Sequence, residues 1–211
     1  MPLLCLPNEL LYCISENLEL ERDINAFAQA NRRLYRLLNT YLYQYNIRRF
    51  GSSALVWAAL HGQEATALKL LREKADGQPT CDGYWTPLCV AAASGQKGMV
   101  ELLLDKGADV NTKGEYHGNA LQEASIDGLE QIVKLLLDQG ADVNAHGGEH
   151  ANALQAASYG GNEQVVKLLL NKGADINAQG GRYGNALQAA LVKGREQIIK
   201  LLLDKDTHRS T

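Results

Sequence analysis

Two carboxylates stand one helical turn apart near the middle of this 211-residue chain, at Glu123 and Asp127. At that spacing both lie on one face of a helix. A carboxylate whose pKa is raised by burial or by a like charge can act as a general acid, with a histidine as the base. The side chains that would line the same pocket are His117, His150 and Tyr159. This set would support acid–base catalysis or the binding of a small ligand.

A metal site has weaker support from the sequence than acid–base catalysis does. His146 and His150 lie four residues apart and, with His117, would supply three ligands. They stand in loop sequence, however, where no helix fixes their spacing. The chain also carries no nucleophile elbow, phosphate loop or HExxH motif. We therefore expect neither a metal nor a cofactor, and we interpret these polar residues as part of a binding face rather than a catalytic centre.

The elements that must position these residues follow a strict period of 33 residues. One leucine recurs at that step, at Leu55, Leu88, Leu121, Leu154 and Leu187. A glycine does the same, at Gly62, Gly95, Gly128, Gly161 and Gly194. Such a period is typical of stacked repeats, each of which buries its apolar face only against its neighbours.

Each unit is predicted to be helix, turn, helix and loop. Residues 152–161 form a short alanine-rich helix that glycine closes. Residues 162–170 form a second helix, for which Asn162 is the expected N-cap. Its apolar stripe consists of Val165, Val166, Leu168 and Leu169.

The motifs Thr86-Pro87-Leu88, Ala91-Ala92 and Gly107-Ala108-Asp109-Val110-Asn111 resemble the ankyrin repeat. The resemblance covers about residues 52–208. It implies an all-α solenoid of five repeats whose loops project as fingers beside a concave face. Three units carry Asn-Ala-Leu-Gln in place of the family's Thr-Pro-Leu-His, at 119–122, 152–155 and 185–188. We expect these amides to form a hydrogen-bond ladder from unit to unit.

In the ankyrin family, targets lie on the fingertips and on the exposed side of the first helices. Carried over, the target-binding residues are Tyr84, Trp85, Glu115, Tyr116, His117, Ile126, Asp127, Glu149, His150, Tyr159, Arg182 and Tyr183. The helix-side positions also include Leu60, His61, Ala93, Ser94, Val192 and Lys193. An aromatic column at Tyr84, His117, His150 and Tyr183 fits a protein or peptide target. The alternative is that these rings pack only against their own fingers.

Residues 1–50 lack the 33-residue period and read as three short helices that precede the array at 51–211. The pattern Leu6-Pro7, Leu10, Ile14 and Leu18 resembles an F-box. That resemblance implies docking to the Skp-type linker subunit of a cullin–RING ligase through Leu6, Pro7, Leu10, Leu11, Ile14 and Ile24. The alternative is a helical cap on the first repeat that binds nothing.

Composition narrows the function further. The 21 basic side chains do not exceed the 24 acidic ones, which disfavours a nucleic-acid partner. No run of about twenty apolar residues predicts a membrane span. We expect a cytoplasmic or nuclear protein-interaction module, acting as the substrate-recognition subunit of an SCF-type ubiquitin ligase. The alternative is a small-molecule-binding protein or an unconventional enzyme with its site in the central ankyrin groove.

Overall fold

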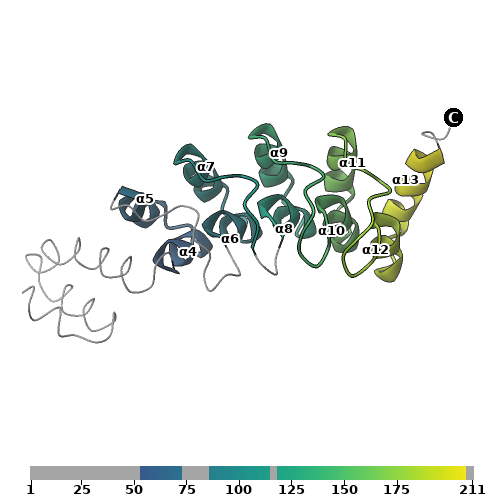
Figure 1. Ribbon diagram of the computed structural model, residues 1–211, viewed down its shortest axis with the longest axis horizontal. Coiled ribbons are helices and arrows are strands. Elements are labelled where there is room, and N and C mark those ends of the chain that lie inside the picture. Colours follow the sequence, from purple (N-terminus) through teal and green to yellow (C-terminus); the bar gives the residue numbers. More distant parts are fainter. Residues whose placement is uncertain (1–52, 73–85, 115–117, 208–211) are drawn as a thin grey trace, which may run out of the picture.

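The computed structural model describes residues 53–72, 86–114 and 118–207 (Figure 1). In these ranges the chain forms helices joined by turns and loops. They are α4 Ser53–Leu60, α5 Glu64–Arg72, α6 Pro87–Ala93, α7 Lys97–Asp105, α8 Ala120–Ile126, α9 Glu130–Asp138, α10 Ala153–Gly160, α11 Glu163–Asn171, α12 Ala186–Val192 and α13 Glu196–Thr207. The three N-terminal helices expected at 1–50 lie outside the described residues.

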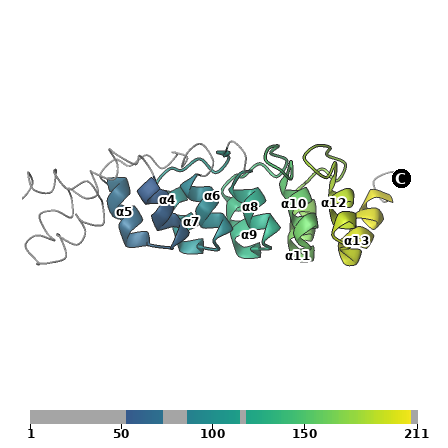
Figure 2. The ribbon, with the colours of Figure 1, turned by 90° about the horizontal axis from the view of Figure 1, so that it is seen from below.

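The helices stand in two rows, one formed by α4, α6, α8, α10 and α12 and the other by α5, α7, α9, α11 and α13 (Figure 1). Consecutive first helices pack on one another far more extensively than consecutive second helices do. The stack therefore curves, with the row of first helices on its inner side. The loops between pairs project together on one side as fingers (Figure 2).

The first helices begin as their sequences predict. In α10, the Asn152 side chain accepts a hydrogen bond from the backbone N–H of Gln155 at 2.9 Å, which caps the helix. Gly161 ends that helix with φ 93°, a left-handed conformation that glycine adopts without a steric penalty. The same cap occurs at Thr86, Asn119 and Asn185 in the units on either side.

The predicted cap of the second helix is wrong. Asn162 stands at the N-cap position of α11, but its side chain makes no capping hydrogen bond. Its Nδ2 instead donates to the carbonyls of Ser125 and Ile126 in the preceding unit, at 3.1 and 2.8 Å. The tight stacking of first helices brings these C-terminal carbonyls of α8 within reach, and they compete successfully for the amide.

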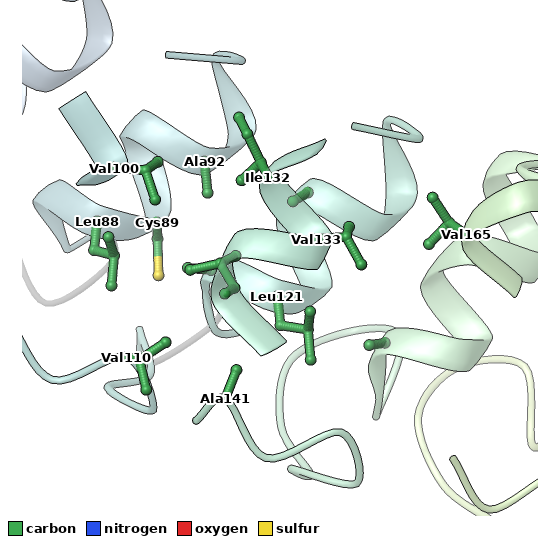
Figure 3. Packing of buried hydrophobic residues seen from close by; sticks show 14 of the residues in the cluster. Leu88, Cys89, Ala92, Val100, Val110, Leu121, Ile132, Val133, Ala141 and Val165 are labelled. Carbon is green, nitrogen blue, oxygen red and sulfur yellow. The ribbon is translucent and has the colours of Figure 1, made fainter. Parts of the chain in front are cut away.

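The core lies between the two rows and runs the length of the stack. Figure 3 shows part of it from close by. Alanines of the first helices, such as Ala92, allow neighbouring backbones to approach closely. The larger side chains fill the space between rows, as Leu121, Val133 and Val165 do at 1% exposure or less. Each such side chain contributes about 1.5–3 kcal/mol by leaving water.

A ladder of side-chain amides joins successive units, as the Asn-Ala-Leu-Gln motif predicts. The Gln122 Nε2 donates to the carbonyls of Ala145 and Ala151 in the next finger, each at 3.0 Å. Gln155 repeats the arrangement one unit later, at 3.3 Å to Ala178 and Gly184. The asparagines cap helices within a unit, and the glutamines connect one unit to the next.

A second ladder runs through the Gly-Ala-Asp loops. Asn111 donates to the carbonyl of Gly140 at 3.3 Å and accepts from the backbone N–H of Asp142 at 2.8 Å. Asn144 makes the same pair of bonds to Gly173 and Asp175. Together the ladders fix the position of each finger relative to the next.

In the part of the chain that the structure describes, every helix is too short or too polar to cross a bilayer.

Candidate functional site

Three aromatic rings from the last two fingers and from α10 form one stack on the finger side of the molecule. The ring centroids of Tyr159 and Tyr183 lie 4.8 Å apart, and those of His150 and Tyr159 lie 4.9 Å apart. His150 and Tyr183 complete the triangle at 5.7 Å. We call these rings, with Glu149, Arg182 and Lys193, the finger junction.

Two hydrogen bonds between Arg182 and Glu149 hold the fingers of the junction together. The Arg182 backbone N–H donates to the Glu149 carbonyl at 2.8 Å, and its guanidinium Nη1 donates to the Glu149 carboxylate at 2.8 Å. Between them, Gly181 has no room for a side chain, because a Cβ there would lie 2.7 Å from the Glu149 carbonyl oxygen. The two fingers are therefore in direct backbone contact.

The finger beside His150 is strained. Ala151 has φ 61°, the one positive φ among non-glycine residues that the structure describes. The Asn152 N–H donates to the His150 carbonyl at 2.7 Å, which closes a tight γ-turn around Ala151. Strain of this kind persists only where surrounding contacts impose it, and it concentrates at functional sites.

The Ala151 side chain also explains an unpaired atom. At the equivalent position of the previous unit, a Cβ on Gly118 would lie 1.6 Å from the Gln122 Oε1. That oxygen accepts a hydrogen bond from the Asn119 N–H and completes a capping box. In the next unit the methyl of Ala151 takes the corresponding space, and the Oε1 of Gln155 is buried without a hydrogen-bond partner.

His150 is neutral in this environment. Burial, the largest effect, lowers the pKa of His150, and the Arg182 charge lowers it further against the opposing charge of Glu149. Its Nδ1 is a buried atom with no hydrogen-bond partner among the described residues. The ring therefore acts as an uncharged stacking surface at neutral pH.

Lys193 makes the edge of the stack cationic. Its ammonium lies 4.4 Å from the centroid of Tyr159, a cation–π contact. Hydrogen bonds from Lys193 and then from the Tyr183 hydroxyl lower the pKa of Tyr159, whereas donating to Tyr159 raises the pKa of Tyr183. Lys193 and the two tyrosines therefore form one interacting group at the edge of the stack.

The carboxylate pair forms a second polar feature on α8. Burial, followed by the charge of Asp127, raises the pKa of Glu123 to about 7, against the opposing effect of a backbone hydrogen bond from Gly118. The pKa of the Cys89 thiol is raised to about 11, chiefly by burial and in part by the Glu123 charge. Glu123 can therefore gain or lose a proton near neutral pH.

The structure brings together part of the predicted site. It joins five predicted target-binding residues, Glu149, His150, Tyr159, Arg182 and Tyr183, in the finger junction, and it places Ile126 and Asp127 at the end of α8. His150 and Tyr183, the two members of the aromatic column within the described residues, stack from one finger to the next. The pKa of Glu123 responds to Asp127 and to the backbone of Gly118, and its charge in turn affects Cys89.

Other predicted residues lie outside the described ranges. They are the target-binding residues Tyr84, Trp85, Glu115, Tyr116 and His117, and the docking residues Leu6, Pro7, Leu10, Leu11, Ile14 and Ile24. His117, one of the three histidines considered as metal ligands, also lies outside the described ranges. Within the described ranges, no three His, Cys, Asp or Glu side chains converge as metal ligands.

Sequence reasoning missed Ala151 and Gly181. The one sequence signal at Ala151 is an alanine where the units before and after have Gly118 and Gly184. Gly181 has a counterpart in Gly148, one unit earlier, whereas the unit before that has Glu115 at the same position. Their roles depend on contact between fingers, which spacing along one chain does not reveal.

A scan against protein families matches the description "Ankyrin repeats" three times, at residues 26–114, 80–147 and 121–210. The first match begins inside residues 1–50, the segment that resembles an F-box. No protein of curated function matches the chain. The matches cover most of the chain and coincide with the stacked helix pairs, so this protein belongs to the ankyrin-repeat family.

Proposed function

We infer from the ankyrin repeats that this chain is a protein-interaction module. We propose that this module selects a target protein for an SCF-type ubiquitin ligase. The finger junction on the inner face of the stack recognises the target, and residues 6–24 dock the Skp-type linker subunit. The chain positions the target, and its partners perform the transfer of ubiquitin.

The finger junction is the observation that carries the target-binding half of this proposal. Tyrosine and arginine are enriched among residues that dominate binding energy, because they bury large areas at low entropic cost. Here Tyr159 and Tyr183 are held in a stack, and the Arg182–Glu149 pair holds the fingers. A surface that is already ordered loses little entropy when a partner binds.

The linker-docking half is supported by the sequence pattern. The spacing of apolar residues ahead of the repeat array resembles that of an F-box, at Leu6-Pro7, Leu10, Leu11, Ile14 and Ile24. The arrangement separates the two tasks along the chain, with linker docking before residue 50 and target recognition near residues 149–193.

Calorimetry of the full chain with a purified Skp-type linker protein tests the docking half. We expect one linker to bind per chain, and Leu10→Asp or Ile14→Asp to abolish binding, because a carboxylate would enter an apolar interface. Lys134→Ala, on the exposed side of α9, is the matched control and should bind as the wild type does. A folded wild-type chain that shows no binding would reduce residues 1–50 to a cap.

The raised pKa of Glu123 favours a second candidate function, the binding of a small ligand at α8. A carboxyl that is half protonated near pH 7 can donate to or accept from a ligand. A fragment library screened by thermal shift at pH 6 and pH 8 tests this. Fragments that stabilise the wild type at one pH only, and lose that dependence in Glu123→Gln, would support it. Identical profiles in both proteins would exclude it.

A further inference from the structure

One apolar side chain from every unit reaches the surface at the end of the first helix. These are Leu60, Ala93, Ile126, Tyr159 and Val192, each 33 residues from the next. Leu60 and Val192 are 48% and 65% exposed, and the other three are half-buried. The buried residues of the same helices pack against neighbouring units. We call this set the apolar row.

The spacing of the row is set by helix packing. Helices in contact lie about 8–10 Å apart, so the row presents one apolar contact at about that interval. A polyproline II helix has three residues per turn and rises about 3.1 Å per residue, so every third side chain recurs on one face after about 9 Å. An α-helix repeats a face after about 5.4 Å, or after about 10.5 Å for every second turn, so the polyproline II repeat matches the interval more closely.

We propose that the apolar row binds an extended, polyproline II-type segment of a partner protein, with apolar side chains at every third residue and acidic residues at the end that lies over α12. This inference specifies the target class of the proposed function and rests on its target-binding half. It is independent of linker docking.

Aromatic rings give the row its anchor. The ring of Tyr159 belongs both to the apolar row and to the finger junction, where it stacks on Tyr183 at 4.8 Å. Aromatic surfaces are the usual contacts of proline-rich segments, because the preformed polyproline II helix has little entropy left to lose. The two tyrosines therefore favour this type of ligand over a flexible polar chain.

Charge determines the direction in which the ligand lies along the apolar row. Lys193 lies over the Tyr159 ring, and the Arg195 Nε donates to the Tyr159 carbonyl at 3.3 Å, so the α12 end of the row is cationic. The α8 end carries Asp127 and Glu123 instead. An acidic group of the ligand is attracted to the α12 end and repelled from the α8 end.

The same contacts exclude a cation-binding aromatic cage. The centroids of Tyr159 and Tyr183 are in direct stacking distance, which leaves no gap for an ammonium group between them. Lys193 already occupies the ring face at 4.4 Å. The cationic edge of the junction is suited to a carboxylate rather than to a basic side chain.

Fluorescence anisotropy with synthetic peptides of about twelve residues tests the proposal. The probe repeats Leu-Pro-Pro and carries two glutamates at its amino end or, in a second version, at its carboxyl end. One control peptide has the same composition with leucine at every second position. Another has glutamine in place of the glutamates. We expect one direction of the Leu-Pro-Pro probe to bind at least tenfold more tightly than both controls.

Variants identify the surface. Tyr159→Ala should weaken binding of the preferred probe about tenfold or more, as expected for a central aromatic anchor. Lys193→Glu should weaken it at low salt, whereas Lys193→Arg should not, because only the charge is required. Lys134→Ala should leave binding unchanged. Circular dichroism melts of each variant show that the stack remains folded.

Two results would overturn the proposal. One is a Leu-Pro-Pro probe that binds no better than the peptide with leucine at every second position. The other is binding that Tyr159→Ala and Lys193→Glu leave unchanged, which would place the peptide elsewhere. Binding of the Skp-type linker by the same preparation is measured in parallel. If linker binding remains while the peptide result fails, the inference about the target fails and the docking half of the proposed function stands.

Discussion

At the scale of single residues, the informative positions are those at which the chain departs from its own repeat. Glu123 occurs where the neighbouring units have Val90 and Ala156, and its carboxyl is buried beside a second carboxylate. Ala151 occurs where the units before and after it have Gly118 and Gly184, and it adopts a positive φ. Both departures introduce an energetic cost on the finger side of the molecule.

Replacing the strained alanine should stabilise the protein. Ala151→Gly removes a steric cost of about 1–2 kcal/mol at φ 61°, partly offset by the greater flexibility of glycine in the unfolded chain. We expect a net increase of about 0.5–1 kcal/mol in the free energy of unfolding, measured by urea denaturation. Gly184→Ala, at the equivalent position with φ 83°, is the reciprocal variant and should destabilise the protein. An Ala151→Gly protein less stable than the wild type would contradict this account of strain.

The buried carboxyl makes stability depend on pH. The folded protein holds the Glu123 proton up to a pKa of about 7, against an ordinary value of 4.5. The free energy of unfolding should therefore fall as the pH rises from 4.5 to 7. Glu123→Gln should remove this decline and stabilise the protein above pH 7 by on the order of 1–3 kcal/mol, with little effect near pH 4.5.

Denaturation curves at pH 4.5, 6 and 8 measure this effect. Asp127→Asn is the control, since it removes the second cause of the raised pKa and should reproduce only part of the stabilisation. Equal stability of wild type and Glu123→Gln at all three values would show that the carboxyl is not desolvated.

At the scale of elements, capping and bridging are divided between different side chains. Asn119, Asn152 and Asn185 cap the first helices of their own units. Asn162 stands at the corresponding place of a second helix but donates to the previous unit. The type of residue is the same in both cases, and the available partners decide its role.

A substitution of Asn162 separates the two roles. Aspartate is as good an N-cap as asparagine, but it cannot donate to the Ser125 and Ile126 carbonyls. We expect Asn162→Asp to lower the free energy of unfolding by about 1–3 kcal/mol, because a charge would face two carbonyl oxygens. Asn185→Asp, at a cap that only accepts, should change it by less than about 0.5 kcal/mol. Equal effects of the two variants in urea denaturation would return Asn162 to a capping role.

The glutamine ladder has an internal control at its end. Gln122→Ala removes two donors to buried finger carbonyls and should cost about 2–4 kcal/mol of unfolding free energy. Gln188 occupies the same register in the last described unit, where its side chain is exposed. Gln188→Ala should therefore change stability by less than about 0.5 kcal/mol. Thermal melts of the two variants give the comparison, and a similar loss in both would show that the ladder is not the source of stability.

At the scale of the whole molecule, stability is distributed along a line. Among the described helices, each unit packs chiefly on its neighbours, through the first helices and the two ladders. Units with a neighbour on both sides therefore have two interfaces, and α12 with α13 has one among the described residues. The finger junction spans the last of these interfaces, between α10 and α12.

Hydrogen exchange should report this gradient. We expect amides of α10 to exchange on the order of tenfold or more slowly than those of α12, because opening α10 disrupts interfaces on both sides. Gln155→Ala, which removes the bonds to Ala178 and Gly184, should speed exchange in α12 and α13 and leave α6 unchanged. Uniform exchange along the stack, measured by mass spectrometry, would instead indicate a single cooperative unit.

The sequence by itself determined the architecture of the array. A 33-residue period in Leu55, Gly62 and their equivalents predicts stacked helix pairs, and the structure confirms them. Local rules were also sufficient for the Gly161 terminator, because it depends on neighbours within a few residues. The apolar stripe of α11 is similarly confirmed, with Val165, Val166 and Leu169 buried.

The tertiary structure alone decided how the units meet. The register placed His150, Tyr159 and Tyr183 near one face, but only the fold shows their rings in one stack. The partner of Asn162 and the strain at Ala151 likewise depend on atoms more than thirty residues away or on finger contacts. A periodic sequence determines each unit through local propensity and burial. The interfaces between units depend on distances across the stack, which no local pattern specifies.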